Sequence, residues 1–237
     1  MSARILVGCP TSLHKTYCLH AYAEGIRHLT YPFLDILLVD NSEDPSYTQH
    51  IKQEGLPVIR GPSLPHAKER IVASRNLLRE RFLQGGYDYL FSLEQDVIPP
   101  ADILERLLAH GKKIISGVVF TRFEMNGEHR IKPLLWGSTE RQDEMRFMDA
   151  EVAAPGLYSI RACGLGCLLI HRDVLEKIPF RLLPDRSTFD DIPFCRDCVD
   201  AGFDLYADTS VKCQHLIEGM NWDAIDDEEK NAGSKHL

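Results

Sequence analysis

The sequence predicts an α/β fold in which a mainly parallel sheet carries helices on both faces. Short apolar runs rich in β-branched residues recur through the first half of the chain, and stretches with the helical spacing of apolar residues separate them. Glycine and proline stand at several of the joints. Strict alternation of strand and helix is typical of parallel sheets. The 237 residues suffice for one large domain with a substantial core.

The first half alternates without interruption. Apolar residues from Tyr17 to Leu29 have helical spacing, and Gly85 and Gly86 provide a stop for the longest helix. Pro99 and Pro100 precede the fourth helix. We expect strands at 5–10, 33–40, 56–61, 87–96 and 112–122, with helices at 17–29, 47–54, 67–84 and 101–111.

The pattern changes after residue 122. Residues 123–160 show no helical period and predict loops and short antiparallel strands. A strand followed by a helix (162–178), a helix (190–203) and a last strand (204–216) complete the expected elements. We therefore predict a single domain over 1–218, and a charged C-terminal tail at 219–237 outside the packed domain.

Composition excludes some classes of function. The net charge of -8 argues against a nucleic-acid-binding protein, which would present a basic face. No apolar run reaches the ~18 to 20 residues of a membrane helix, and the N-terminus is too short in apolar residues for a secretory signal. These features indicate a cytoplasmic protein without a transmembrane segment, which could still serve a membrane-linked pathway.

Two carboxylates stand at the end of the fourth strand, in the segment YLFSLEQDVIPP. Residues i and i+2 of a strand point to the same face, so Glu94 and Asp96 could reach one cation. Their hard oxygen ligands suit Mg²⁺ or Mn²⁺. The alternative is a solvated loop start, since short acidic motifs are common.

Later in the chain, Asp190 and Asp191 precede a helix. Helix capping explains one of them, and a general base explains the other if it faces a cleft. His215, at the end of the last strand, is either a packed histidine or a metal ligand.

Nucleotide-binding loops of the common types are missing. The sequence contains no P-loop and no dinucleotide fingerprint after its first strand, and the pair Gly164 and Gly166 is too short for one. The seven cysteines permit a zinc site, although their positions in apolar runs favour core thiols.

The order of these pieces is more specific than any one of them. The chain contains these pieces in the following order: strand–CPT, strand–VDNS, helix–ASRN, strand–EQDVIPP, GLGCLLIHR, DDIPFC and a terminal histidine. This order resembles nucleotide-sugar glycosyltransferases of the GT-A fold, of the inverting family-2 type, over residues 4 to 218. The resemblance implies a Rossmann-related αβα sandwich with a small antiparallel addition in the C-terminal half. It also implies a nucleotide-binding half at about 1–122 and an acceptor or catalytic half at 123–218.

The resemblance assigns roles by position. It implies a divalent metal, Mn²⁺ or Mg²⁺, held by Asp96 and His215 with Glu94 at the ribose or a metal-bound water. Asp191 matches the acceptor-activating base, and Asp190 stands where the family has glutamate. The Gly164 and Gly166 loop matches the region of donor sugar and acceptor. The residues implied to contact the nucleotide are Cys9, Pro10, Thr11, Asp40, Arg75 and Glu94.

The sequence departs from this pattern at two positions, since Glu94 replaces the first aspartate of D-x-D and Asp190 replaces a glutamate. The expected partner is a nucleoside-diphosphate sugar, with a glycan, a lipid-linked sugar or a protein as acceptor. Retention of configuration, a nucleotidyltransferase, a non-catalytic nucleotide-sugar-binding protein and a zinc-structured interaction protein are the alternatives. Phe123, Trp136 and Phe147 could form an acceptor platform or pack in the fold.

Overall fold

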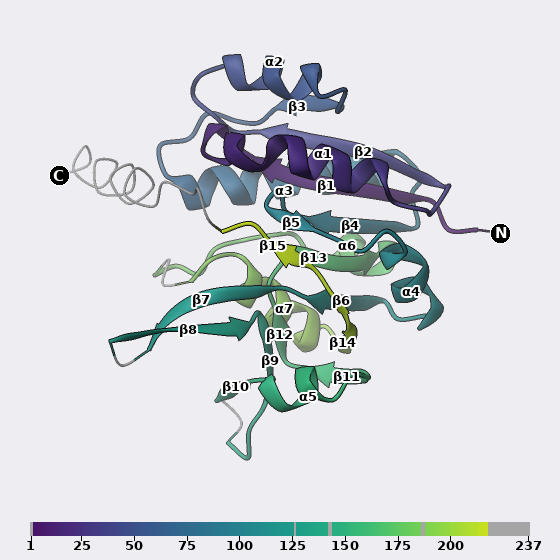
Figure 1. Ribbon diagram of the computed structural model, residues 1–237, viewed down its shortest axis with the longest axis vertical. Helices are drawn as coiled ribbons and strands as arrows, with labels where there is room; N and C mark the ends of the chain where they lie inside the picture. Colours follow the sequence, from purple (N-terminus) through teal and green to yellow (C-terminus); the bar gives the residue numbers. More distant parts are fainter. Residues whose placement is uncertain (1, 126, 142–143, 186–187, 218–237) are drawn as a thin grey trace.

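The computed structural model describes residues 2–125, 127–141, 144–185 and 188–217, so the predicted tail lies outside the described residues. The chain forms three layers, with helices on both faces of one large sheet (Figure 1). The predicted α/β class with a mainly parallel sheet is confirmed. Among the described residues, no helix combines the length and the apolar character that crossing a bilayer requires.

The large sheet has eight strands in the order β11-β14-β6-β13-β4-β1-β2-β3. β1 pairs in parallel with β2 and β4, β2 pairs in parallel with β3, and β14 pairs in parallel with β6. β13 runs antiparallel between β4 and β6, and β11 is an antiparallel edge strand. The bounds are β1 (Ile5–Thr11), β2 (Leu34–Asp40), β3 (Val58–Arg60), β4 (Tyr89–Leu93), β6 (Ile114–Val118), β11 (Leu157–Ile160), β13 (Cys167–His171) and β14 (Leu205–Lys212).

The helices divide between the two faces because side chains alternate along each strand. In β1, Ile5, Val7 and Cys9 pack with α1, α2 and α4, whereas Leu6 packs with α3, α6 and α7 on the other face. A 3₁₀ helix, η1, follows β1 directly. The bounds are η1 (Leu13–Cys18), α1 (Leu19–Arg27), α2 (Ser46–Gln53), α3 (Ala67–Gln84), α4 (Ile103–Ala109), α5 (Asp149–Ala153), α6 (Arg172–Lys177) and α7 (Asp191–Asp200).

Small antiparallel pairings surround the C-terminal half of the sheet. β7 and β8 form a hairpin that projects from the body of the molecule (Figure 1), β9 pairs with β10 and β12, and β15 pairs with β5. Their bounds are β5 (Val97–Ile98), β7 (Phe120–Met125), β8 (Glu128–Pro133), β9 (Leu135–Ser138), β10 (Met145–Phe147), β12 (Ala162–Cys163) and β15 (Gln214–His215). The predicted short antiparallel strands of 123–160 are therefore present.

Three predicted strands are shorter than expected, and each break matters for the site. The strand predicted at 87–96 ends at Leu93, where a turn begins with Val97 N donating to Glu94 O at 2.9 Å. The one predicted at 112–122 divides into β6 and β7, and the one predicted at 204–216 divides into β14 and β15. The breaks release the chain from the sheet at its carboxyl edge, where polar side chains collect.

Candidate functional site

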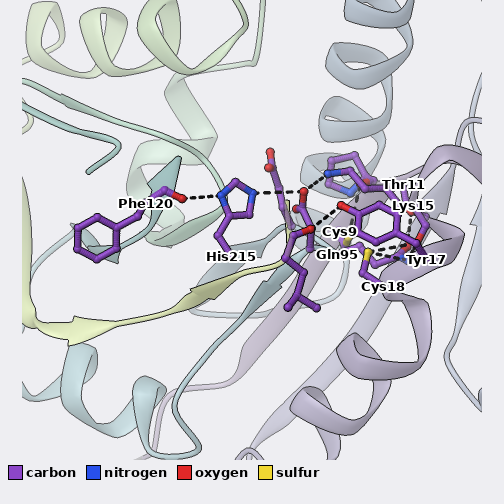
Figure 2. A network of polar contacts seen from close by, with 12 residues as sticks. Cys9, Thr11, Lys15, Tyr17, Cys18, Gln95, Phe120 and His215 are labelled. Carbon is purple, nitrogen blue, oxygen red and sulfur yellow. Dashed lines mark hydrogen bonds and ion pairs between the residues drawn. The ribbon is translucent and has the colours of Figure 1, made fainter. Parts of the chain in front are cut away.

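Asp96 lies at the centre of a buried polar cluster at the carboxyl edge of the large sheet. It follows β4 and is only 2% exposed. Its Oδ2 accepts a hydrogen bond from Lys15 Nζ and lies 3.3 Å from His215 Nε2. Three segments, η1, the turn after β4 and the C-terminal β15, bring these side chains together, and Figure 2 shows Lys15 and His215 in the resulting network. Asp96 and His215, predicted as metal ligands, are thus neighbours.

The cluster holds strong charges. Burial favours the protonated form of Asp96, but the hydrogen bond from His215 and the positive charge of Lys15 outweigh burial and lower its pKa to about 2. Burial likewise acts to lower the pKa of His215, yet the Asp96 carboxylate raises it above its ordinary value. One carboxylate therefore faces an ammonium group and an imidazole whose protonated form it stabilises.

His215 has a defined orientation. Its Nδ1 lies 2.6 Å from the carbonyl oxygen of Phe120. Because a carbonyl oxygen only accepts, Nδ1 carries the proton and Nε2 is directed at Asp96. A backbone carbonyl behind one ring nitrogen is the arrangement by which proteins orient metal-binding histidines.

Gln95, between the two carboxylates, was not identified from the sequence. It is 1% exposed, and its Oε1 accepts hydrogen bonds from the hydroxyl groups of Thr11 and Tyr47. Its Nε2 donates to the Lys15 carbonyl oxygen at 2.7 Å (Figure 2). Gln95 thereby fixes η1, and with it Lys15, against the turn that carries Asp96.

Glu94 belongs to a second cluster. Because β4 ends before it, the strand alternation that predicted a shared face for Glu94 and Asp96 does not apply, and the turn separates them. Glu94 Oε1 accepts from Arg75 of α3 at 2.6 Å, and Arg75 also donates to Ser92 Oγ at 2.9 Å. Arg75 Nε lies 2.9 Å from Asp190 Oδ2, an ion pair without hydrogen-bond alignment. The buried guanidinium thus joins α3, the end of β4 and the start of α7.

Asp190 and Asp191 differ in their surroundings. Asp190 occupies the capping position of α7, but its carboxylate makes no capping hydrogen bond and turns instead to Arg75. Asp191 is half-buried, and its Oδ1 accepts from its neighbour's backbone, Ile192 N, at 2.8 Å. Burial raises the pKa of Asp191 to about 6, and the nearby charges of Asp190 and Glu94 add to the effect. A carboxylate with such a pKa is suited to general-base chemistry.

Asp40 organises a loop at the end of β2. It is fully buried, and its oxygens accept from Ser42 N at 2.9 Å, Thr48 Oγ1 at 2.6 Å and Arg60 at 2.8 Å. The Ser42 hydroxyl donates to Asp40 at 2.6 Å and accepts from Leu13 N at 2.7 Å, which ties this loop to η1.

A cavity of about 240 Å³ lies between these two loops. It is at the carboxyl ends of parallel strands β1 and β2, where ligands bind in open α/β sheets. The cavity was not predicted, although the predicted Asp40 shapes the loop that lines it. Its lining includes Ser12, His14, Asn41, Ser42, Glu43 and Arg70.

The other predicted nucleotide contacts lie nearby in different environments. Cys9 is fully buried, and burial raises the pKa of its thiol, while Pro10 is half-buried and Thr11 is bonded to Gln95. The loop containing Gly164 and Gly166 packs against the end of β4. A Cβ at Gly166 would lie 3.5 Å from Glu94 Oε2 and 3.3 Å from Val97, so glycine permits this close approach.

The metal assignment can be tested against the donor atoms. Asp96 Oδ1 is buried and accepts no hydrogen bond within the described part of the chain. Such an oxygen fits Mg²⁺ or Mn²⁺, which bind through one or two carboxylates and complete their shell with water and substrate phosphates. The described residues contain no preformed group of three His, Cys, Asp or Glu side chains for a metal. The fit therefore rests on Asp96 with His215 beside it, and Glu94 is engaged by Arg75.

The remaining candidates pack within the fold. Phe123 and Trp136 each pack against Phe147, with ring centroids 5.0 Å and 5.8 Å apart. All seven cysteines are buried free thiols.

The sequence matches no known family profile and no curated protein. Among solved structures, the mannosyltransferase PcManGT from Pyrobaculum calidifontis, in complex with GDP-Man and Mn²⁺, is similar with a TM-score of 0.62 at 13% identity. That similarity covers 100% of this chain and 63% of the mannosyltransferase chain. A protein from STIV gives a TM-score of 0.49 at 16% identity, over 91% of this chain and 87% of that one. The likeness to the mannosyltransferase shows that the chain has a GT-A glycosyltransferase fold.

Proposed function

We propose that this chain is a divalent-metal-dependent glycosyltransferase that moves a sugar from a nucleoside-diphosphate sugar to an acceptor hydroxyl with inversion. The observation that carries the proposal is the cluster around Asp96. A buried carboxylate with one unpaired oxygen, an oriented histidine and a lysine meet at the carboxyl edge of a GT-A sheet. This cluster suits the binding of a metal together with a diphosphate.

The residues divide the work between two clusters. Asp96 and His215 would hold Mn²⁺ or Mg²⁺, which as a Lewis acid stabilises the negative charge that grows on a diphosphate leaving group. The cavity between the loops after β1 and β2 would receive the nucleoside. Arg75 holds Glu94, which lies beside Gly166, and also pairs with Asp190. Asp191 accepts the proton of the acceptor hydroxyl.

The first experiment is a binding screen. Nucleoside diphosphates and their sugars, with GDP-Man among them because the structural neighbour holds it, are tested for a rise in melting temperature with Mn²⁺ and with EDTA. A metal-dependent rise with one nucleotide supports the donor site. No rise with any nucleotide under either condition contradicts it.

The second experiment separates an enzyme from a binding protein. Asp191→Asn keeps the shape and the acceptor for Ile192 N, so donor binding should persist while transfer or donor hydrolysis falls at least about 100-fold. The matched control is Asp200→Asn, an exposed aspartate at the end of the same helix. Unchanged turnover in Asp191→Asn would show that Asp191 is not the base, and NMR of the product anomer tests inversion.

A further inference from the structure

Lys15 is held in place by its surroundings. Its backbone N donates to Ser12 O at 2.9 Å, and its carbonyl oxygen accepts from Gln95 Nε2 at 2.7 Å. Gln95 is itself anchored by Thr11 and Tyr47. The Lys15 side chain is 21% exposed, while its partner Asp96 is 2% exposed. Lys15 is therefore the more solvent-exposed partner of this ion pair.

The charges of this cluster oppose a bare divalent cation. Asp96 contributes one negative charge, which Lys15 already neutralises, and His215 is a further positive group when protonated. The adjacent Glu94 is engaged by Arg75, which it shares with Asp190. A metal ion that approaches the unpaired Oδ1 of Asp96 therefore meets an ammonium group on the other oxygen of the same carboxylate. Like charges at such separations repel strongly in a partly buried site.

A diphosphate reverses this balance because it brings two or more negative charges. We propose that Lys15 is a phosphate-binding residue of the donor site. Its ammonium holds Asp96 in the free protein and contacts the diphosphate oxygens in the loaded one, so that metal and nucleoside diphosphate bind as a pair. This inference rests on the proposed function, because it takes the ligand of the site to be a nucleoside diphosphate.

The consequence is thermodynamic coupling between two ligands. Each ligand should raise the affinity of the other by the same factor, within the range of ~5 to 150-fold that is usual for coupled sites. Replacing a lysine that served only as a structural ion pair would still tighten Mn²⁺ binding, because its charge is lost, but it would leave the affinity for the nucleotide in EDTA unchanged.

The test uses titration calorimetry at one fixed pH, with Mn²⁺ alone, GDP or UDP in EDTA, and each nucleotide with Mn²⁺. For the native chain we expect weak Mn²⁺ binding that tightens at least about tenfold with the nucleotide. For Lys15→Met we expect Mn²⁺ alone to bind about tenfold more tightly and the nucleotide in EDTA about tenfold more weakly, since the ammonium is gone. The matched control, Lys52→Met, removes an exposed lysine of α2 and should leave every value within about twofold.

A second, more conservative variant of Lys15 controls for the case in which Lys15→Met does not fold. Lys15→Gln keeps a hydrogen-bond donor for Asp96 without the charge, and should shift both affinities in the same directions as Lys15→Met. If a nucleotide binds and both variants bind it in EDTA within twofold of the native chain, the inference about Lys15 is wrong and the proposed function stands. If no nucleotide of the binding screen, GDP and UDP included, binds with or without Mn²⁺, both are overturned.

Discussion

Asp190 and Asp191 are adjacent carboxylates that the structure places in different surroundings. Burial raises the pKa of both, but Arg75 opposes the rise at Asp190 by direct ion pairing. At Asp191 the hydrogen bond from Ile192 N and a smaller contribution from the charge of Arg75 oppose burial. The sequence alone allowed a cap and a base in either order, since capping and catalysis favour the same residue type at a helix start. The position of the Arg75 guanidinium distinguishes their surroundings, and the resemblance had already pointed to Asp191 as the base.

The pH dependence of turnover follows from Asp191. A general base must be ionised, and its pKa of about 6 means that protonation inactivates it below that pH. With donor saturating, kcat should be level above pH ~7 and should fall tenfold per pH unit below ~6. Donor affinity measured over the same pH range serves as the control, because weaker donor binding at low pH would also lower turnover. A fall in kcat that begins only near pH 4 would contradict the assignment of Asp191 as the base.

Arg75 can be tested by a double-mutant cycle. Arg75→Met leaves the buried Asp190 without its cation and Glu94 without its partner, so unfolding free energy should fall by about 3–5 kcal/mol. Adding Asp190→Asn removes the stranded charge and should recover more than about 1 kcal/mol. Urea unfolding measures both, with Arg81→Met, exposed on the same helix, as the control. Additive losses in the double variant would show that the ion pair is not coupled.

At the scale of elements, the order of strands and helices follows from local periodicity, but sheet order does not. Each predicted strand from 5–10 to 112–122 corresponds to an observed one because its apolar run is local. The insertion of β13 antiparallel between β4 and β6 depends on contacts between distant segments, and its apolar run would fit either direction. The turn at 94–97 could likewise not be predicted from the sequence, because the acidic residues continue the strand pattern and no glycine marks the turn.

Gln95 joins three elements and its replacement should loosen all of them. Gln95→Leu keeps much of the volume but leaves the hydroxyls of Thr11 and Tyr47 and the Lys15 carbonyl without their partner. We expect a loss of about 2–4 kcal/mol in unfolding free energy, since each buried unsatisfied polar group costs about 1–3 kcal/mol. Gln53→Leu, exposed in α2, should change stability by less than about 0.5 kcal/mol. An equal effect of both replacements in thermal or urea unfolding would rule out a linking role for Gln95.

At the scale of the whole molecule, the site depends on segments from opposite ends of the chain. Tyr17 OH donates to Leu216 O at 2.7 Å, and Leu216 N donates to Asp96 O at 2.7 Å, so the last described strand closes onto the first loop. A resemblance that spans the chain predicted Asp96 and His215 as metal ligands. It gave no reason to select Lys15 or Gln95, because a lysine and a glutamine in polar segments are ordinary surface residues until the fold buries them.

The pKa shifts of Asp96 and Asp191 predict that the two carboxylates affect the free energy of unfolding in opposite ways as the pH changes. The pKa of Asp96 is lowered to about 2 in the folded state, so its ion pairs contribute stability above pH ~4 that is lost as the pH falls towards 2. The pKa of Asp191 is raised to about 6 in the folded state, so ionisation of this residue lowers the free energy of unfolding. This loss is absent below pH ~4 and complete above pH ~6. Asp96→Asn should therefore destabilise the metal-free chain by about 2 kcal/mol at pH 5 and much less at pH 2.5.

Asp191→Asn should do the reverse. It should stabilise the chain by about 2 kcal/mol at pH 7.5 and have little effect at pH 3.5, because the native carboxyl is protonated there in both the folded and the unfolded state. Urea unfolding in EDTA across this pH range measures both variants, with Asp200→Asn as a surface reference. A gain in Asp191→Asn together with lost turnover would mean that the fold gives up stability at this residue to keep a base near neutral pH. A loss of stability at pH 7.5 would mean instead that Asp191 is held as a charged structural group, and the general-base assignment would then have to be abandoned.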